Sequence, residues 1–217
     1  MIISIDGPAG SGKSTVARLV SEKLGFEHFN SGSLYRGITV YLVKESIDLT
    51  STKIPKINLC TYFENGTQKV VVNGVDFTNE LRNNEISVLT PRVSAVKALR
   101  NIVDNCQRNY AKNKNIIVDG RDIGSHVFPN ADLKIYLDCT IQERARRRFL
   151  EEQTKGSKIT IEEIEKQIAE RDEIDRNKKI APLVVPKGAI VIDSTNLTID
   201  EVVDKIVVLY QNLKKQT

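Results

Sequence analysis

The stretch Gly7-Pro8-Ala9-Gly10-Ser11-Gly12-Lys13-Ser14 follows the P-loop pattern: a glycine, four residues, a second glycine, a lysine and a serine. An apolar run at Ile2–Asp6 precedes it and predicts a short buried strand, and apolar residues at helical spacing follow within Lys13–Leu24. The free N–H groups and dipole of a helix N-terminus favour a polyphosphate, and glycines let the backbone approach it closely. The stretch therefore predicts a nucleotide-binding loop.

Two residues of this loop have distinct expected roles. The Lys13 ammonium is expected to reach the β- and γ-phosphates, and the Ser14 hydroxyl is expected to be a ligand of Mg²⁺. A chance match is the alternative, and the flanking strand and helix disfavour it. We therefore predict binding of ATP or GTP. The expected contacts are Gly7, Pro8, Ala9, Gly10, Ser11, Gly12, Lys13, Ser14 and Thr15.

The composition is that of a soluble globular protein. The 217 residues are 40% hydrophobic and 28% charged, which is enough apolar material for one good core. A net charge of +4 suits small anionic ligands but falls short of a nucleic-acid-binding signature. With no apolar stretch of membrane-spanning length and no signal-like segment, we expect a cytoplasmic monomer that binds neither membranes nor nucleic acids. Three cysteines without metal or disulfide spacing are expected to be reduced.

Strand-like and helix-like segments alternate along most of the chain. Strands are predicted at 2–6, 27–30, 115–119, 133–138 and 189–193, and helices at 13–24, 33–45, 93–112, 141–153, 160–176 and 199–214. This alternation predicts an α/β fold in which a parallel five-stranded sheet lies between two helical layers. Ligands of such sheets bind at the carboxyl ends of the strands.

Two segments interrupt this core. Strand-like runs at 59–64, 67–72 and 75–78 are joined by Asn-Gly dipeptides and predict a small antiparallel meander. It is either a surface insertion or a lobe that binds a second substrate. The polar break at 155–158 between two charged helices predicts the tip of a lid. We expect one domain, with its core at 1–56, 87–150 and 180–217, the insertion at about 57–86 and the lid at about 151–179.

Charged residues follow two of the predicted strands. Arg36 lies about one turn into the helix after the second strand, where Ser31 is a candidate N-cap, and a solvated helix charge is its alternative. Asp119 closes the third core strand and is a candidate to hold Mg²⁺ through water, with Arg121 and Asp122 turned toward the cleft. A simple turn is the alternative for this segment.

Two helices carry further basic residues on one face. Arg144, Arg147 and Arg148 share a face of one helix and are either solvated or clamp phosphates when a lid closes. Arg171 and Asp175 form either a surface ion pair or a site for phosphate and sugar hydroxyls, with Lys178 one turn further on.

Taken together, these motifs resemble the bacterial cytidylate kinase family over nearly the whole chain. The resemblance is carried by 5–15, 31–36, 119–124, 171–175 and 181–183. It implies transfer of the γ-phosphoryl group of ATP to CMP or dCMP with Mg²⁺, and it favours an acceptor-binding role for the meander. Two positions depart from the family pattern: Pro91 replaces a usual serine, and Lys178 replaces a usual arginine.

The motifs and the resemblance together give roles to individual residues. The resemblance itself would assign Arg36 and Arg121 to the acceptor phosphate, Arg100 and Asp122 to the cytosine, and Arg171 and Asp175 to the ribose. Lys13, Arg36, Arg121 and Arg171 would be catalytic, and Arg144 and Arg148 would bind ATP. Ser14, and Asp119 through water, would hold the metal. Contacts to CMP would come from Ser33, Arg36, Arg100, Arg121, Asp122, Arg171, Asp175 and Lys178. An acid such as Asp122 can accept a hydrogen bond from the exocyclic amine of cytosine, whereas uracil presents a carbonyl there.

Three other functions are compatible with a P-loop. A kinase for UMP, AMP or a metabolite alcohol differs only in its acceptor contacts. A GTP-dependent switch would require an Asn-Lys-x-Asp motif, which the sequence lacks. A nucleic-acid-binding module is disfavoured by the nearly balanced charge.

Overall fold

The computed structural model describes residues 1–48, 54–81, 83–154 and 156–216. The chain divides into two compact units. The first comprises Met1–His28 and Asn115–Thr217, and the second comprises Phe29–Lys114. Lys155, at the predicted lid tip, lies outside the described residues. Among the described residues, no helix combines the length and apolar character needed to cross a membrane.

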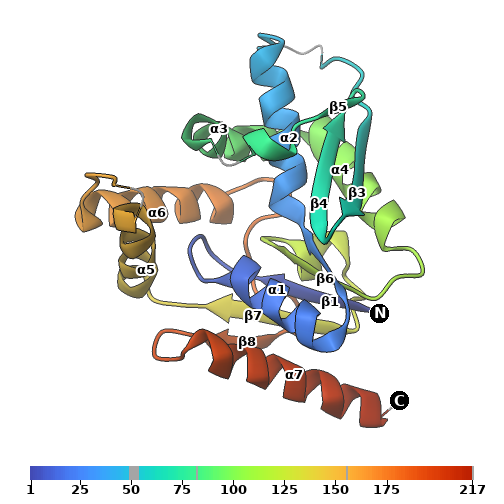
Figure 1. The fold of residues 1–217 in the computed structure, drawn as a ribbon, viewed down its shortest axis with the longest axis vertical. Helices are drawn as coiled ribbons and strands as arrows, with labels where there is room; N and C mark the ends of the chain where they lie inside the picture. Colours follow the sequence, from blue (N-terminus) through green and yellow to red (C-terminus); the bar gives the residue numbers. More distant parts are fainter. Residues whose placement is uncertain (49–53, 82, 155, 217) are drawn as a thin grey trace. The chain divides into compact units, whose positions relative to one another are not determined.

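A five-stranded sheet organises the first unit, with strand order β2-β6-β1-β7-β8. Figure 1 labels β6, β1, β7 and β8 of this sheet. The central strand β1 pairs in parallel with both β6 and β7, and β7 pairs in parallel with β8. The predicted α/β fold with a parallel sheet is confirmed, and the predicted strand ends differ by at most one residue. The strands are β1 (Ile2–Asp6), β2 (Glu27–Asn30), β6 (Ile116–Gly120), β7 (Leu133–Asp138) and β8 (Ile190–Asp193).

Two helices pack on this sheet to form the core of the first unit. They are α1 (Lys13–Leu24) and α7 (Ile199–Gln216), and Figure 1 shows α7 running alongside β8. Ile3 and Ile5 of β1 are fully buried against apolar residues of α1 and α7 at helical spacing. Because β1 ends in this core, the loop that follows it is anchored to a rigid strand.

A helical pair, α5 (Ile141–Thr154) and α6 (Ile161–Arg176), occupies the segment predicted as part of the lid. Ala145, Ile164 and Ile168 form its apolar contact. A capping box starts α6, because the Thr160 side chain accepts from the Glu163 N–H while the Glu163 carboxylate accepts from the Thr160 N–H. Closure of this pair over a nucleotide stays a prediction.

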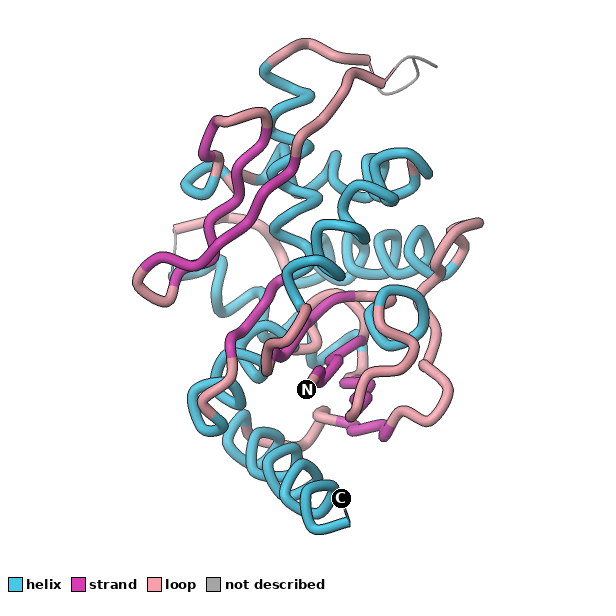
Figure 2. Tube along the Cα trace, turned by 90° about the vertical axis from the view of Figure 1, so that its right-hand side faces the viewer, coloured by secondary structure: helices cyan, strands magenta, loops and turns pink. Residues whose placement is uncertain are grey.

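The second unit contains the predicted antiparallel meander (Figure 2). Asn65 and Asn73 adopt positive φ, as the first residue of an Asn-Gly hairpin turn requires. The third strand ends at Asp76 rather than at residue 78, because Asp76 accepts hydrogen bonds from the Thr78 N–H and hydroxyl and turns the chain. The elements are α2 (Ser31–Lys44), β3 (Leu59–Glu64), β4 (Thr67–Val72), β5 (Val75–Asp76), η1 (Thr78–Glu80), α3 (Asn84–Ala95) and α4 (Lys97–Ala111).

The prediction of one helix over 93–112 is wrong. Two helices occupy this region, because Val96 is extended with ψ 114° and separates α3 from α4. Sequence analysis missed most of α3, whose start is capped by Asn83 and whose interior contains Pro91. A proline inside a helix removes one backbone hydrogen bond, so the pattern favours a helix there only weakly.

Candidate active site

The P-loop lies between β1 and α1, as its sequence predicts. Gly7, Gly10 and Gly12 have φ values of 150°, 76° and 87°. A Cβ atom at Gly7 would lie 2.2 Å from the Leu137 carbonyl oxygen, so a side chain does not fit there. The glycines therefore allow the backbone to turn closely over the sheet and direct N–H groups toward an anion.

The Lys13 side chain is buried inside this loop, with 5% of its surface exposed. Its ammonium donates to the Pro8 carbonyl and, at 3.2 Å, to the Ser11 hydroxyl. Burial, followed by the positive charge of Arg121, lowers the pKa of Lys13, and Arg171 acts in the same direction. The charges of Arg121 and Arg171 thus both act on Lys13, and this accumulation of positive charge favours binding of a highly charged anion.

Ser14 and Asp119 meet at the ends of the loop and of β6. The Ser14 hydroxyl donates to Asp119 Oδ2 at 2.6 Å. A hydroxyl oxygen that donates its proton in this way can still bind a cation through its lone pairs. A hydroxyl ligand backed by a carboxylate fits Mg²⁺, which keeps several waters and takes few protein ligands. The donor set therefore fits the predicted metal role of both residues.

Asp6 is a buried carboxyl group that sequence analysis did not assign. Its two oxygens accept from the Ile123 N–H at 2.6 Å and the Gly124 N–H at 2.7 Å. A Cβ at Gly124 would lie 2.6 Å from Ser4 Oγ, so this close approach requires glycine. Asp6 thereby fixes the segment that follows Arg121 and Asp122 to the strand that precedes the P-loop. Asp122 itself is buried.

Asp6 predicts a pH dependence of stability. Burial outweighs the Gly124 and Ile123 hydrogen bonds and raises the pKa of Asp6 from 3.8 to about 7. Between these values the folded protein retains a proton that the unfolded chain has lost. The free energy of unfolding should therefore fall as pH rises from about 4 to about 7, by at most about 1.4 kcal/mol per pH unit from this group.

Urea unfolding of the wild type and of Asp6→Asn between pH 5 and pH 8 measures this contribution. In Asp6→Asn, the free energy of unfolding should no longer show the part of its fall between pH 5 and pH 7 that comes from Asp6. The variant should also be less stable at every pH, because an amide has only one oxygen to accept the two N–H groups. Parallel stability curves for the two proteins would contradict the assignment.

Arg121, Asp175 and Lys178 form one buried ionic cluster. Asp175 Oδ2 lies 2.9 Å from Arg121 Nε, and its Oδ1 lies 2.6 Å from Lys178 Nζ. Burial raises the pKa of Asp175, but the charges of Arg121 and Lys178 outweigh it and hold that pKa below its usual value. The alternative of an exposed Arg171–Asp175 surface pair is wrong, because Asp175 is only 3% exposed. Arg171 lies half-buried one turn earlier on α6.

Arg144, predicted to bind ATP, forms a buried network with the P-loop itself. Its guanidinium donates to the Ala9 carbonyl at 2.9 Å and to Asp172 Oδ2 at 2.6 Å. Asp172 Oδ1 in turn accepts from the Ala9 N–H at 3.2 Å. Both backbone groups of Ala9 are thus held by α5 and α6, so this pair positions the phosphate-binding loop. Direct contact of Arg144 with ATP stays a prediction.

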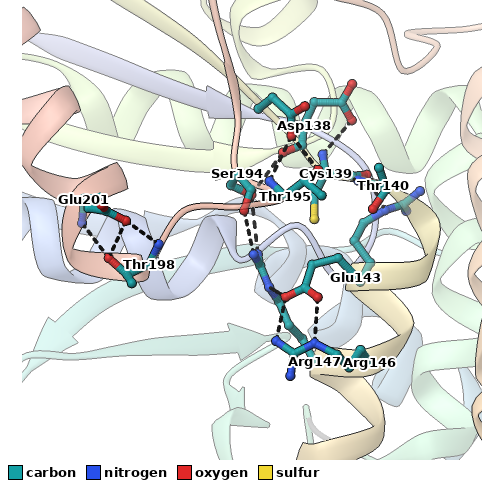
Figure 3. Close-up of polar contacts among 12 residues, drawn as sticks. Asp138, Cys139, Thr140, Glu143, Arg146, Arg147, Ser194, Thr195, Thr198 and Glu201 are labelled. Carbon is teal, nitrogen blue, oxygen red and sulfur yellow. Dashed lines mark hydrogen bonds and ion pairs between the residues drawn. The ribbon is translucent and has the colours of Figure 1, made fainter.

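The other arginines of α5 have different environments. Figure 3 shows Glu143 between Arg146 and Arg147. The hydrogen bond from Arg146, and to a smaller extent the one from Arg147, lowers the pKa of Glu143 to about 2. Arg147 also donates to the Ser194 carbonyl at 2.7 Å and so connects α5 to the loop between β8 and α7 (Figure 3). Arg148 is half-buried on the same helix, and its predicted contact with ATP stays a prediction.

Three predicted acceptor residues belong to the second unit. The Asn30 side chain, rather than Ser31, caps α2, because it accepts from the Ser33 N–H at 2.9 Å and the Ser33 hydroxyl at 3.1 Å. Arg36 is half-buried one turn further along. Arg100, 2% exposed, donates to the Ser94 carbonyl at 3.2 Å and lies 5.6 Å from the Tyr35 ring centre. Their roles toward a substrate stay predictions.

The structure brings together more residues than the sequence predicts. His28 and Asp172 contact predicted site residues, and Asp6 holds the segment directly after Asp122; none of the three was assigned a role from the sequence. Asp6 could have been found as a carboxylate at a strand end beside the P-loop. His28 and Asp172 are distant in sequence from their partners, so only the fold identifies them.

A phosphate-binding loop, converging cations and a hydroxyl–carboxylate pair on a parallel sheet define a P-loop kinase. The cytidylate kinase family model matches residues 3–212, and the chain belongs to this family. The cytidylate kinase of Alkaliphilus oremlandii is 41% identical over 97% of this chain and 98% of its own length. That of Shouchella clausii is 42% identical over 99% and 97%, respectively.

Solved structures share the fold at much lower identity. Shikimate kinase from Bacteroides thetaiotaomicron has a TM-score of 0.50 and 13% identity, with 97% of this chain and 98% of that chain covered. Shikimate kinase from Acinetobacter baumannii, solved with shikimate, has a TM-score of 0.50 and 16% identity, with 97% and 93% covered. These likenesses concern the fold alone.

Proposed function

We propose that the protein transfers the γ-phosphoryl group of ATP to CMP or dCMP and releases ADP with CDP or dCDP. The observation that carries this proposal is the hydrogen-bonded Ser14–Asp119 pair beside the P-loop lysine, whose charge Arg121 and Arg171 both oppose. Phosphoryl transfer needs charge neutralisation and alignment more than covalent chemistry, and these residues supply both. The names of the curated relatives support cytidine monophosphates as acceptors.

The donor side follows from the P-loop. Backbone N–H groups and Lys13 would hold the β- and γ-phosphates, and Mg²⁺ would be held by Ser14 directly and by Asp119 through water. When bound, Mg²⁺ neutralises charge on the phosphate oxygens. Arg144 and Asp172 keep Ala9, and with it the loop, in place. Closure of the lid at about 151–179 would exclude water from the reacting phosphate.

The acceptor phosphate, ribose and base each have proposed contacts. Arg36, Arg121 and Arg171 bind the acceptor phosphate, and the insertion at about 57–86 is an acceptor-binding lobe. Asp175 accepts from ribose hydroxyls, with Ser33 and Lys178 as further contacts. Arg100 and Asp122 read the cytosine, because a carboxylate accepts from its exocyclic amine. We expect the enzyme to act as a cytoplasmic monomer, and sedimentation measurements test that state.

The test is an acceptor screen. Purified protein is incubated with Mg-ATP and, in separate reactions, with CMP, dCMP, UMP, AMP, shikimate or no acceptor, and ADP formation is followed. We expect rapid turnover with CMP and dCMP and much slower turnover with the others, because uracil would face the Asp122 carboxylate with a carbonyl. ADP release that does not depend on an acceptor would refute the proposal in favour of a nucleotide hydrolase. Preference for AMP or shikimate would change the substrate class.

A further inference from the structure

Both carboxylate oxygens of Asp119 have a hydrogen-bond partner within the first unit. Ser14 donates to Oδ2 at 2.6 Å, and His28 Nε2 lies 2.7 Å from Oδ1. His28 comes from β2, the strand adjacent to β6 in the sheet, and its side chain is 19% exposed. Asp119 is 3% exposed. The imidazole and the P-loop hydroxyl therefore bind different oxygens of the same carboxylate.

The chemistry of the pair fixes the direction of the second hydrogen bond. His28 Nε2 lies 2.7 Å from Asp119 Oδ1. A carboxylate oxygen can only accept a hydrogen bond, so His28 donates to it through Nε2–H. A charge-assisted hydrogen bond of this kind restricts rotation of the carboxylate about its terminal torsion.

We infer that His28 is a positioning residue for the Mg²⁺-nucleotide site, because it holds the Asp119 carboxylate in the orientation that engages Ser14. This inference rests on the proposed function, in which Ser14 and Asp119 hold the metal. Without the imidazole, Asp119 can turn away from Ser14 and from the metal-bound water that it would accept from. His28 touches neither the nucleotide nor the metal in this scheme; it acts only through Asp119.

The experiment compares His28→Leu, which removes the donor, with His28→Gln, whose side-chain amide can place an N–H near the position of Nε2. Lys23→Gln serves as the control, because Lys23 forms an ion pair with Asp204 at 2.6 Å on the exposed side of α1. Calorimetry measures ADP binding at a series of Mg²⁺ concentrations and again in EDTA. Circular dichroism gives the melting temperature of each protein.

We expect His28→Leu to raise the Mg²⁺ concentration for half-maximal stimulation of ADP binding by roughly 3- to 10-fold. That is less than the 10- to 100-fold typical of losing a partner of a direct metal ligand, since one further bond intervenes. ADP binding in EDTA and the KM for CMP should stay within about twofold of the wild type. His28→Gln should recover most of the Mg²⁺ response, and Lys23→Gln should match the wild type.

Two results would overturn the inference. One is an unchanged Mg²⁺ requirement in His28→Leu, whatever its melting temperature, because this would leave His28 a purely structural role. The other is a shift that His28→Gln does not relieve. If His28→Leu does not fold, His28→Gln and His28→Asn are compared instead. The shorter asparagine amide does not reach Asp119, so an equal Mg²⁺ requirement in these two variants would also overturn the inference. Failure of the proposed function appears separately, as wild-type protein that binds Mg-ADP but does not phosphorylate CMP.

Discussion

Lys13→Met should abolish phosphoryl transfer while the protein stays folded. In the proposed mechanism Lys13 is the P-loop side chain that brings a positive charge to the transferred phosphate. Removing one preorganised donor of this kind typically costs about 10²- to 10³-fold in kcat. Methionine has a similar shape and fits the buried space around the Lys13 stem. Because burial already disfavours the lysine charge, the melting temperature should not fall.

Initial rates with saturating CMP and Mg-ATP measure this effect, and Lys23→Met is the matched control on the same helix. Lys23 is half exposed and pairs with Asp204, so its loss should leave kcat unchanged. Substantial activity in folded Lys13→Met would show that the Lys13 ammonium is not needed for phosphoryl transfer.

The second large effect should come from Arg144→Met. The Arg144 and Asp172 side chains are only 5% and 4% exposed, so removing the arginine leaves a buried carboxylate without its cationic partner. Breaking such a pair typically costs about 3–5 kcal/mol of stability. The Ala9 carbonyl also loses its donor, so we expect weaker nucleotide binding as well as a lower melting temperature.

Arg146→Met is the control for this prediction. Arg146 pairs with Glu143 on the same helix, but its side chain is 56% exposed, so its loss should lower the melting temperature far less than the loss of Arg144. Thermal unfolding and calorimetric titration with ADP compare the two variants. Equal melting temperatures would show that the buried pair does not secure the loop. In Arg144→Met combined with Asp172→Leu, the orphaned charge is gone and part of the lost stability should return.

Much of the first unit could be predicted from local pattern. The P-loop, α1 and the strands of the sheet follow from short apolar runs, helical spacing and glycine positions, all of which act over a few neighbouring residues. The Asn-Gly turns at Asn65 and Asn73 fixed the meander for the same reason, since only a few residue types adopt positive φ readily. The sequence did not show that α3 and α4 are two helices. The break lies at Val96, which is extended, and α3 contains Pro91, and neither feature follows from the helix propensity of these residues.

The sequence showed which charged residues belong to the candidate site, but it did not show which residues they contact. Arg171 and Asp175 share a helical face and suggested a surface pair, whereas Asp175 is buried between Arg121 and Lys178. Arg144 and Arg148 were both expected to bind ATP, yet Arg144 donates hydrogen bonds to Asp172 and to the Ala9 carbonyl. Helical spacing shows which residues share a face, but it cannot show what that face packs against.

The sequence by itself determined that this chain has a phosphate-binding loop on a parallel sheet, because that loop depends on glycines, one lysine and the strand and helix beside it. Only the tertiary structure decided which distant residues form hydrogen bonds with the loop and with the charged residues beside it. Asp6 binds the N–H groups of residues 123 and 124, His28 binds Asp119, and Asp172 binds Ala9. These partners are separated by 91 to 163 positions in the chain. Their hydrogen bonds exist only because strand order and helix packing bring them within 3.2 Å, and no local propensity encodes that approach.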